Sequence, residues 1–542
     1  DRLGTLVASQ KRFIAHAAHE LRSPLTALLG ELSLATRRER TAEEYKLAID
    51  EALDATRRLK LLTEDLLALA LLGTDAAPEP LAMQELMVRE AAADARATGD
   101  VLGAVGSLST VYCMSWSYDD PVGRLAERLG IAPVHRATSG MSGTSAQSLA
   151  LSAARRIREG DLDVAVVAGA EALATKRALK KAGERPAWSH RADPAPPMPF
   201  DWPFHPAEIA HEVFQACLTF ALRDVARRAH LGRTPAAHRQ HLGRLLAPMT
   251  LVAANNPHAW DRTVRTADEL IEATPANRMV SSPYTKHMVA VMDVDMAAAF
   301  VLASSEAADH LGVPPERRVH LRGWAEADDA PYVAEHPDLW RSPAMAWCAH
   351  HTLSAAGVTA DEVAHLDLYS CFASSIEFAL DALGIDADGL GGRDVTVTGG
   401  LPYAGGPASN YLAHSIASMV HRLRRDPGAV GLTTGVGMHM TKHSWAAWST
   451  APRPVLESPA PPPAATVPIL DTYEGAATIA PASVLHDRTG APVSGVAVCD
   501  VAGGRTYARS EDPDLLRRWE DDECVGDVVR VTSDGGRNVA TG

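Results

Sequence analysis

The residues best suited to chemistry lie near the start of the chain, in residues 13–25 (Phe-Ile-Ala-His-Ala-Ala-His-Glu-Leu-Arg-Ser-Pro-Leu). An imidazole that accepts a phosphoryl group needs an exposed nitrogen and a neighbouring base to take its proton. His19 and Glu20 satisfy that requirement in sequence. His16 lies three residues earlier, on nearly the same face of a helix, and we interpret it as a bystander.

The surrounding residues 3–72 have the periodicity of two long helices. The first apolar stripe consists of Leu21, Leu25, Leu28 and Leu32, and the second runs through residues 49–69. Two long helices joined by a short turn make a helical hairpin. Its apolar seam predicts a second copy that completes a four-helix bundle. Pro24 is expected to kink the first helix near His19.

Residues 1–72 resemble the dimerisation and phosphoacceptor hairpin of two-component sensor histidine kinases. The resemblance implies that His19 is the phosphoacceptor and Glu20 the base, with Arg22 and Pro24 also matching the pattern. The Asn-containing helix and Gly-rich lid of a kinase ATP-binding domain are not found after residue 72. We therefore expect phosphate to come from a partner kinase and to pass to a response regulator, without autokinase activity.

Composition limits the remaining possibilities. A chain of 542 residues suggests two to four domains, and its net charge of −15 argues against nucleic-acid binding. The six cysteines show neither CxxC pairing nor zinc-finger spacing, so we predict a reduced, cytoplasmic setting and no metal site. No apolar run approaches the roughly 18 residues that a membrane span needs.

After a linker at 73–80, residues 81–450 alternate helical patterns with short apolar runs, which predicts an α/β layered fold with mostly parallel strands. Helices are expected at 81–97, 144–159, 205–230, 374–383 and 411–425. Buried strands are expected at 163–170, 297–304, 366–369, 395–398 and 430–434. The proline-rich residues 451–466 predict an extended linker, and 467–542 a small β barrel or sandwich.

Several segments of this body resemble thiolases, especially bacterial thiolase-like proteins near the sterol-carrier-protein type, which include acetyl-CoA acetyltransferase-like proteins. The segments are 116–121 (Trp-Ser-Tyr-Asp-Asp-Pro), 255–260 (Asn-Asn-Pro-His-Ala-Trp), 277–284 (Asn-Arg-Met-Val-Ser-Ser-Pro-Tyr), 368–372 (Leu-Tyr-Ser-Cys-Phe), 399–407 (Gly-Gly-Leu-Pro-Tyr-Ala-Gly-Gly-Pro) and 441–443 (Thr-Lys-His). The resemblance implies an αβαβα fold, an extra C-terminal β domain for residues from 467 on, and a homodimer.

Thiolase chemistry needs a nucleophilic cysteine at a helix N-terminus, where the helix end lowers the thiol pKa. The matching segment 138–147 (Thr-Ser-Gly-Met-Ser-Gly-Thr-Ser-Ala-Gln) contains no cysteine and places Gly143 at that position, with Ser142 or Thr144 as alternatives. Ser142 is an alternative nucleophile, but a hydroxyl needs an adjacent base, so we favour a helix cap as its role.

The other positions that the resemblance marks are also altered. The oxyanion or activating residue becomes Tyr369, and Cys371 follows it as either a reactive or a packing residue. The histidine of a Gly-His-Pro motif is lost in Gly405-Gly406-Pro407, and the loop of the second cysteine corresponds to 433–437, with Thr434 nearest and Gly435 beside it. His439 and His443 are the histidines near these loops. The Gly-rich run at 399–407 would let a thin ligand approach the backbone closely.

Thiolases begin with a strand before the first helix, and no such strand precedes residues 81–97. We expect that strand to be central, so that its loss would leave a gap inside the first sheet.

The sequence thus favours a thiolase-like protein that binds acyl-CoA or a related thioester, needs no further cofactor, and is weakly active or inactive. One alternative is a phosphorelay protein that acts through His19. The other is a fusion whose two parts share no function.

Overall fold

The computed structural model describes residues 41, 45, 77–200, 204–454 and 458–542. The chain divides into two compact units, residues 1–82 and 83–542. The predicted hairpin, with His19 and Glu20, lies outside the described residues. Within the described part, no helix is both long enough and apolar enough to cross a membrane.

The first sheet lies in the order β2-β1-β3-β6. Its strands are β1 (Ser107–Thr110), β2 (His135–Thr138), β3 (Val164–Ala172) and β6 (Asp295–Ala303). β1 pairs in parallel with β2 and β3, whereas β3 pairs antiparallel with β6. All nine residues of β3 are buried, as expected for a strand that is covered on both faces.

The second sheet lies in the order β7-β10-β9-β8. Its strands are β7 (His320–Asp328), β8 (Val363–Asp367), β9 (Val430–Gly437) and β10 (Lys442–Ser449). β8 and β9 are parallel, and β10 is antiparallel to both β9 and β7. β3 and β9 therefore occupy equivalent places in the two sheets, as do β6 and β10.

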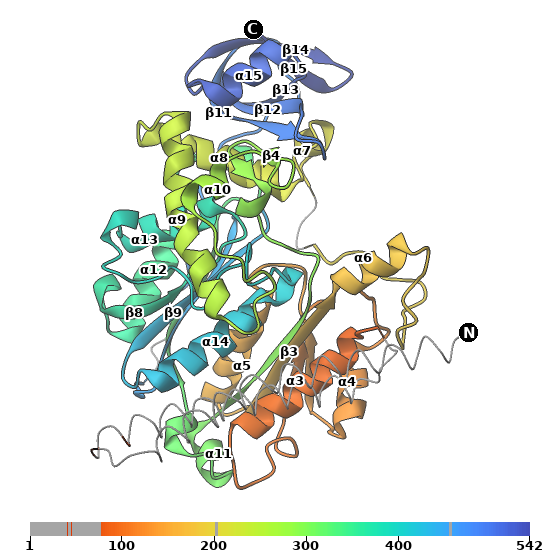
Figure 1. Cartoon of the computed structure of the whole chain (residues 1–542), viewed down its shortest axis with the longest axis vertical. Helices are drawn as coiled ribbons and strands as arrows, with labels where there is room; N and C mark the ends of the chain where they lie inside the picture. Colours follow the sequence, from red (N-terminus) through yellow and green to blue (C-terminus); the bar gives the residue numbers. More distant parts are fainter. Residues whose placement is uncertain (1–40, 42–44, 46–76, 201–203, 455–457) are drawn as a thin grey trace. The chain divides into compact units, whose positions relative to one another are not determined.

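Helices complete five layers (Figure 1). α5 (Ser145–Arg158) and α14 (Tyr411–Arg425) pack on each other and on strands of both sheets, so they form the middle layer. α12 (Pro343–Ala356) and α13 (Ala373–Leu383) belong to the second sheet, with α12 on β7 and β10, and α4 (Pro121–Leu129) packs on β1 and β2. The chain also contains α3 (Pro80–Asp94), α6 (Leu173–Lys181) and α11 (Ser305–His310). The predicted αβαβα layering is confirmed.

α5 illustrates why these elements form. Its small apolar residues Ala146, Ala150 and Leu151 recur on one face and are fully buried between the sheets. Basic residues in its last turn, including Arg155 and Arg158, complement the negative end of the helix dipole.

The expected gap inside the first sheet is not present. β1, β3 and β6 pair without interruption. Among the described residues, the strand expected before the first helix is therefore missing from the edge of the sheet, beside β6, and not from its centre. The second sheet shows the reason, because the strand that precedes its first helix, β7, is itself an edge strand beside β10. A missing edge strand leaves the rest of a sheet intact, whereas a missing central strand would divide it.

Two predicted elements are wrong. Residues 395–398 form no strand, because the buried carboxylate of Asp367 takes hydrogen bonds from the Thr396 hydroxyl (2.6 Å) and the Val397 amide (3.1 Å). The single helix expected at 205–230 is split into α7 (Pro206–Ala210) and α8 (Ala216–His230). The break lies at Glu212, whose φ of 59° is left-handed and cannot continue a right-handed helix.

The segment between β3 and β6 carries further elements, which are α9 (Pro235–Asn255), α10 (Ala267–Ile271), β4 (Met279–Ser281) and β5 (Tyr284–Thr285). α9 begins at a Thr234 cap, whose hydroxyl accepts the Ala237 amide (3.2 Å), and at Pro235, whose ring presets helical φ.

The C-terminal residues form β11 (Gly475–His486), β12 (Pro492–Val501), β13 (Gly504–Ser510), α15 (Pro513–Asp521), β14 (Val528–Asp534) and β15 (Arg537–Thr541). The pairing runs β11-β12-β13-β15-β14 and returns to β11, which closes a small barrel. A small β barrel was one of the two arrangements predicted for this region.

Candidate functional site at the N-terminus of α5

The start of α5 carries the position predicted for a nucleophile. Thr144 is the N-cap residue, and helical residues begin at Ser145. The Ser142 hydroxyl accepts the Thr144 amide (3.2 Å) and lies 2.8 Å from the Thr144 hydroxyl. Ser142 therefore serves the helix terminus, and none of its described hydrogen bonds involves an imidazole.

No side chain fits at Gly143. An ideal Cβ built there would lie 2.1 Å from the carbonyl oxygen of Val436 and 2.3 Å from the phenol oxygen of Tyr369. Real Cβ atoms essentially never approach other atoms that closely. The space in which a nucleophilic side chain would begin is filled by Tyr369 and by the backbone of β9.

Tyr369 is held firmly in this place. Its backbone amide donates to the Thr434 hydroxyl (2.9 Å), and its ring meets Tyr411 edge-on with centroids 5.7 Å apart. Burial raises the pKa of the phenol well above its usual value, so it stays protonated at neutral pH. Tyr369 can fill space or donate a hydrogen bond, but it cannot act as a base there.

Cys371 lies two residues further on, with its thiol 3.6 Å from the Ser375 hydroxyl. Burial raises the pKa of this thiol to about 12. Because the thiolate is the reactive form, this environment favours the packing interpretation of Cys371.

This environment predicts slow alkylation of Cys371. At pH 7.5, iodoacetamide should modify it about 10³-fold more slowly in the folded protein than in guanidinium, because a pKa near 12 lowers the thiolate fraction relative to a free thiol. Mass spectrometry of the peptide that contains Cys371 measures both rates, with Cys371→Ser to assign the peptide. Equal rates in the two states would contradict the prediction.

The two candidate histidines occupy different surroundings. His439 is buried, its Nδ1 lies 3.1 Å from the Thr219 hydroxyl, and its Nε2 has no hydrogen-bond partner. Burial lowers its pKa to about 4, so the ring is neutral. The Nε2 of His443 contacts both Asp329 (3.1 Å) and Ser342 (3.3 Å). A catalytic triad would use opposite ring nitrogens for these two partners.

The Gly-rich run that was predicted to admit a ligand packs against protein. A Cβ at Gly405 would lie 2.6 Å from the Met296 sulfur, and one at Gly406 would lie 3.3 Å from the Ala290 Cβ. Pro407 is buried beside them. In the β9 loop, a Cβ at Gly435 would lie 2.6 Å from Leu412 Cδ1. The ligand-binding role of these residues stays a prediction.

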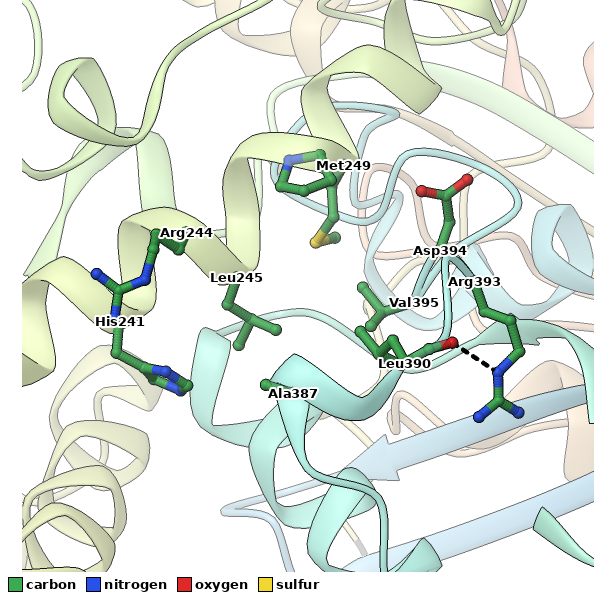
Figure 2. A pocket seen from close by; sticks show the side chains of 10 residues that line it. His241, Arg244, Leu245, Met249, Ala387, Leu390, Arg393, Asp394 and Val395 are labelled. Carbon is green, nitrogen blue, oxygen red and sulfur yellow. Dashed lines mark hydrogen bonds between the residues drawn. The ribbon is translucent and has the colours of Figure 1, made fainter. Parts of the chain in front are cut away.

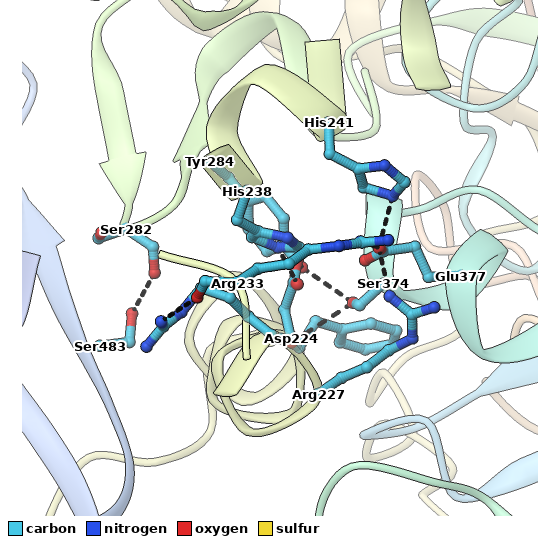
Figure 3. Close-up of polar contacts among 12 residues, drawn as sticks. Asp224, Arg227, Arg233, His238, His241, Ser282, Tyr284, Ser374, Glu377 and Ser483 are labelled. Carbon is cyan, nitrogen blue, oxygen red and sulfur yellow. Dashed lines mark hydrogen bonds and ion pairs between the residues drawn. The ribbon is translucent and has the colours of Figure 1, made fainter. Parts of the chain in front are cut away.

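A buried polar network that sequence reasoning missed lies between α8, α9 and α13 (Figure 3). Asp224 binds His238 Nε2 (2.6 Å) and the Tyr284 hydroxyl (2.5 Å). Glu377 binds Arg227 (2.5 Å) and His241 Nε2 (3.0 Å) through the same oxygen. Burial raises the pKa of Asp224, but its contacts with His238 and Tyr284 hold the net value below the ordinary one. The sequence signal was His238-x-x-His241, one helical turn apart on α9.

This network has the residue types of a metal site, since ligand atoms of Asp224, His238 and Glu377 lie within 4.8 Å of one another. Arg227 and Arg233 nevertheless both approach the Oε1 of Glu377, at 2.5 and 3.8 Å. Two guanidinium groups supply the positive charge that a cation would bring, so the geometry favours a structural network.

A pocket of about 110 Å³ lies beside this network, between α9 and the residues 387–395 (Figure 2). Leu245, Met249 and Val395 line its apolar part, and His241 and Arg244 project from α9. Arg393 also lines it, but its guanidinium is bound to the carbonyls of Leu390, Ala360 and Val363. His241 is thus shared by the pocket and the network.

The five layers define a thiolase-like fold. The crystal structure of a monomeric SCP2-thiolase like protein type 1 from Mycobacterium smegmatis superposes with a TM-score of 0.74 and 29% identity, covering 85% of this chain and 95% of that one. This likeness confirms the thiolase-like fold inferred from the sequence motifs.

The start of the chain matches a different class. Residues 9–74 match the His Kinase A (phospho-acceptor) domain. The chain is 40% identical over 75 residues to the sensor protein IrlS of Burkholderia pseudomallei and 38% identical over 77 residues to the sensor protein CzcS of Cupriavidus metallidurans. Each match covers 14% of this chain and 16% of the relative, so the chain spans about a sixth of these sensors. The chain thus joins a phosphoacceptor domain to a thiolase-like body.

Proposed function

We propose that the thiolase-like body binds an acyl-CoA or a related thioester without catalysing thiolysis or carbon–carbon condensation. The observation that carries this proposal is that Tyr369 and the Val436 carbonyl fill the space beside Gly143, the residue predicted to stand at the nucleophile's position. The likeness to an SCP2-thiolase like protein supports a thioester as the class of ligand.

The remaining reactive groups support the same conclusion. Covalent catalysis needs a nucleophile within hydrogen-bond reach of a base. Ser142 is bonded to Thr144, and the Cys371 thiol stays protonated. The neutral ring of His439 is bonded to Thr219. In the described contacts, no nucleophile among the predicted residues is paired with an imidazole.

Calorimetric titration with acetyl-CoA and with a longer acyl-CoA tests the binding half of the proposal, with free CoA as the control. A thiolysis assay with 3-ketoacyl-CoA tests the other half, in which we expect no turnover above the rate without protein. Turnover above that rate would overturn the inactive assignment, and its loss in Cys371→Ser would identify Cys371 as the nucleophile. The absence of any thioester binding would overturn the assignment of a thioester as the ligand.

A second function is favoured by the match at residues 9–74. We propose that His19, with Glu20 as its base, accepts phosphate from a partner kinase and passes it to a response-regulator aspartate. Radiolabelled phosphate from a sensor kinase should label the wild type and not His19→Gln, whereas His16→Gln should be labelled normally. Equal labelling of the two variants would refute the assignment of His19.

A further inference from the structure

The segment 173–200, which follows β3, concentrates positive charge on an acidic chain. It contains six Lys and Arg residues and two Asp and Glu residues, whereas the whole chain has a net charge of −15. Four of the cations lie on α6, which contains no acidic residue: Lys176, Arg177, Lys180 and Lys181. At about 100° per residue, these four positions fall on one face of the helix, roughly 140° wide. A local reversal of sign of this kind attracts an acidic partner over a distance.

These cations lie at the outside of the thiolase-like body, since α6 is placed beyond the end of β3 (Figure 1). None of the nine residues of α6 is buried. Four exposed cations form what we call the basic surface: Lys176, Lys180, Lys181 and Arg185. Arg185 lies close to the end of α6, because the chain turns there and Glu184 donates its amide to the Leu179 carbonyl (2.9 Å). Within the described residues, no ion pair involves the basic surface.

The loop that follows α6 is anchored to the rest of the body. The rings of Trp116 and Trp188 meet edge-on with centroids 5.4 Å apart, and the Trp116 Nε1 donates to the Ser189 carbonyl (2.9 Å). The Ala192 amide donates to the Ser117 carbonyl (2.8 Å). The basic surface therefore belongs to a fixed part of the fold, and charges that are already in place lose less entropy when a partner binds.

The segment 173–200 also adjoins the candidate site at α5. α5 packs on β3, and a short connection joins the two, so the N-terminus of α5 and the C-terminal end of β3 lie at the same end of the first sheet. α6 follows that end of β3 directly. At the other end of the segment, the Pro199 carbonyl accepts the amide of Met141, two residues before Gly143 (3.1 Å). A partner on the basic surface is therefore placed beside the site at α5.

The form of α6 distinguishes between the partners that positive charge could attract. The nucleotide of CoA would need a concave subsite, whereas a helix without a buried residue presents a convex surface. An anionic membrane would need a free apolar face on the helix, but Leu173, Ala174 and Leu179 are partly buried. A convex, basic helix fits the surface of an acidic protein, because complementary charges orient such a contact.

We propose, on the basis of the proposed thioester ligand, that the basic surface docks a small acidic carrier protein that holds its acyl group as a thioester on a phosphopantetheine arm. Such a carrier offers the same thioester as acyl-CoA, with an acidic protein surface in place of the nucleotide. The basic surface attracts and orients the carrier, and the site at α5 receives the arm.

Charge reversal tests the docking surface. The double variant Lys180→Glu/Lys181→Glu should bind acetylated holo acyl carrier protein about 10-fold more weakly than the wild type at low salt, because two attractions become repulsions. The difference should shrink as the salt concentration is raised. Acetyl-CoA and acetylpantetheine should bind the variant as they bind the wild type. Fluorescence anisotropy of the labelled carrier and calorimetry of the small thioesters measure these affinities with the full chain, and thermal unfolding verifies that the fold is retained.

The C-terminal barrel offers a matched control. Arg488 and Arg530 are exposed there, and Arg488→Glu/Arg530→Glu changes the net charge of the chain by the same amount. This variant should bind the carrier as the wild type does. Equal weakening in the two double variants, an equal loss of acetyl-CoA binding in Lys180→Glu/Lys181→Glu, or a wild type that does not bind the carrier would overturn the proposal. Wild-type binding to phosphatidylserine vesicles that Lys180→Glu/Lys181→Glu abolishes, with carrier binding unchanged, would also overturn it.

The apo carrier, which has no phosphopantetheine arm, separates this proposal from the proposed function. It should bind the wild type more weakly than the acetylated holo carrier does, and Lys180→Glu/Lys181→Glu should weaken that binding further, because the basic surface acts without the arm. If the apo carrier behaves in this way and no small thioester binds, the docking surface stands and the thioester site fails. If small thioesters bind and neither form of the carrier does, the thioester site stands and the docking surface fails.

Discussion

Gly143→Ala is expected to lower the free energy of unfolding by about 3 kcal/mol. The added methyl group would lie 2.1 Å from the Val436 carbonyl oxygen and 2.3 Å from the Tyr369 phenol oxygen. The carbonyl belongs to β9, which is paired on both sides and cannot move without disturbing the second sheet. Chemical denaturation monitored by circular dichroism measures the change.

Gly106→Ala provides the control for this substitution. A Cβ there would meet no atom closer than 3.7 Å, and neither Gly106 nor Gly143 has a positive φ. Gly106→Ala should therefore change stability by less than about 1 kcal/mol. A similar loss of unfolding free energy in Gly106→Ala and Gly143→Ala would mean that the space beside Gly143 is not filled as described.

The same contacts predict the outcome of restoring the family nucleophile. Gly143→Cys meets the same atoms at its Cβ, so it should destabilise the protein and confer no thiolysis. We therefore expect that a single substitution at Gly143 cannot introduce a nucleophile while Tyr369 holds this place.

Glu208→Gln should make the unfolding free energy of the protein less dependent on pH. Glu208 is fully buried and accepts from the Tyr507 hydroxyl (2.9 Å) and the Val333 amide (3.3 Å), while its Oε2 has no partner. Burial raises its pKa from 4.5 to about 7. The stabilisation by the protonated carboxyl is therefore complete below about pH 4.5 and is lost as the pH rises through 7.

The expected difference between the two proteins follows from that shift. From pH 4.5 to pH 8, the unfolding free energy of Glu208→Gln should rise by about 3 kcal/mol relative to the wild type. Denaturation curves at several pH values measure this difference. Glu212→Gln is the control, because Glu212 is partly exposed and its hydrogen bond from Arg509 lowers its pKa. The difference in unfolding free energy between Glu212→Gln and the wild type should therefore stay nearly constant between about pH 5 and 8. Parallel pH profiles for wild type and Glu208→Gln would contradict the assignment.

Much of the architecture could be predicted from local patterns. The apolar runs at 163–170 and 430–434 predicted β3 and β9, because strands covered on both faces are continuously hydrophobic. Periodicity and caps located α5, α13 and α14 within two residues. The motif order was enough to identify the thiolase-like fold, and the absence of a cysteine at 138–147 was visible without coordinates.

Other features depend on partners that are remote in sequence. Residues 395–398 have strand-like composition, but the Asp367 carboxylate binds their polar groups. The network of Asp224, His238 and Glu377 combines three helices, and sequence spacing links none of them to another. Such contacts are set by packing, which local propensity does not contain.

The sequence by itself determined which chemical groups this protein has: a histidine-kinase phosphoacceptor domain at residues 9–74, and a thiolase-like body without a cysteine in residues 138–147. Only the tertiary structure decided that Tyr369 and the Val436 carbonyl fill the space beside Gly143. It also decided that, among the described residues, the first sheet lacks an edge strand beside β6 and not a central strand. Residue identity is local information. The occupancy of a site and the order of strands follow from long-range packing and hydrogen bonding.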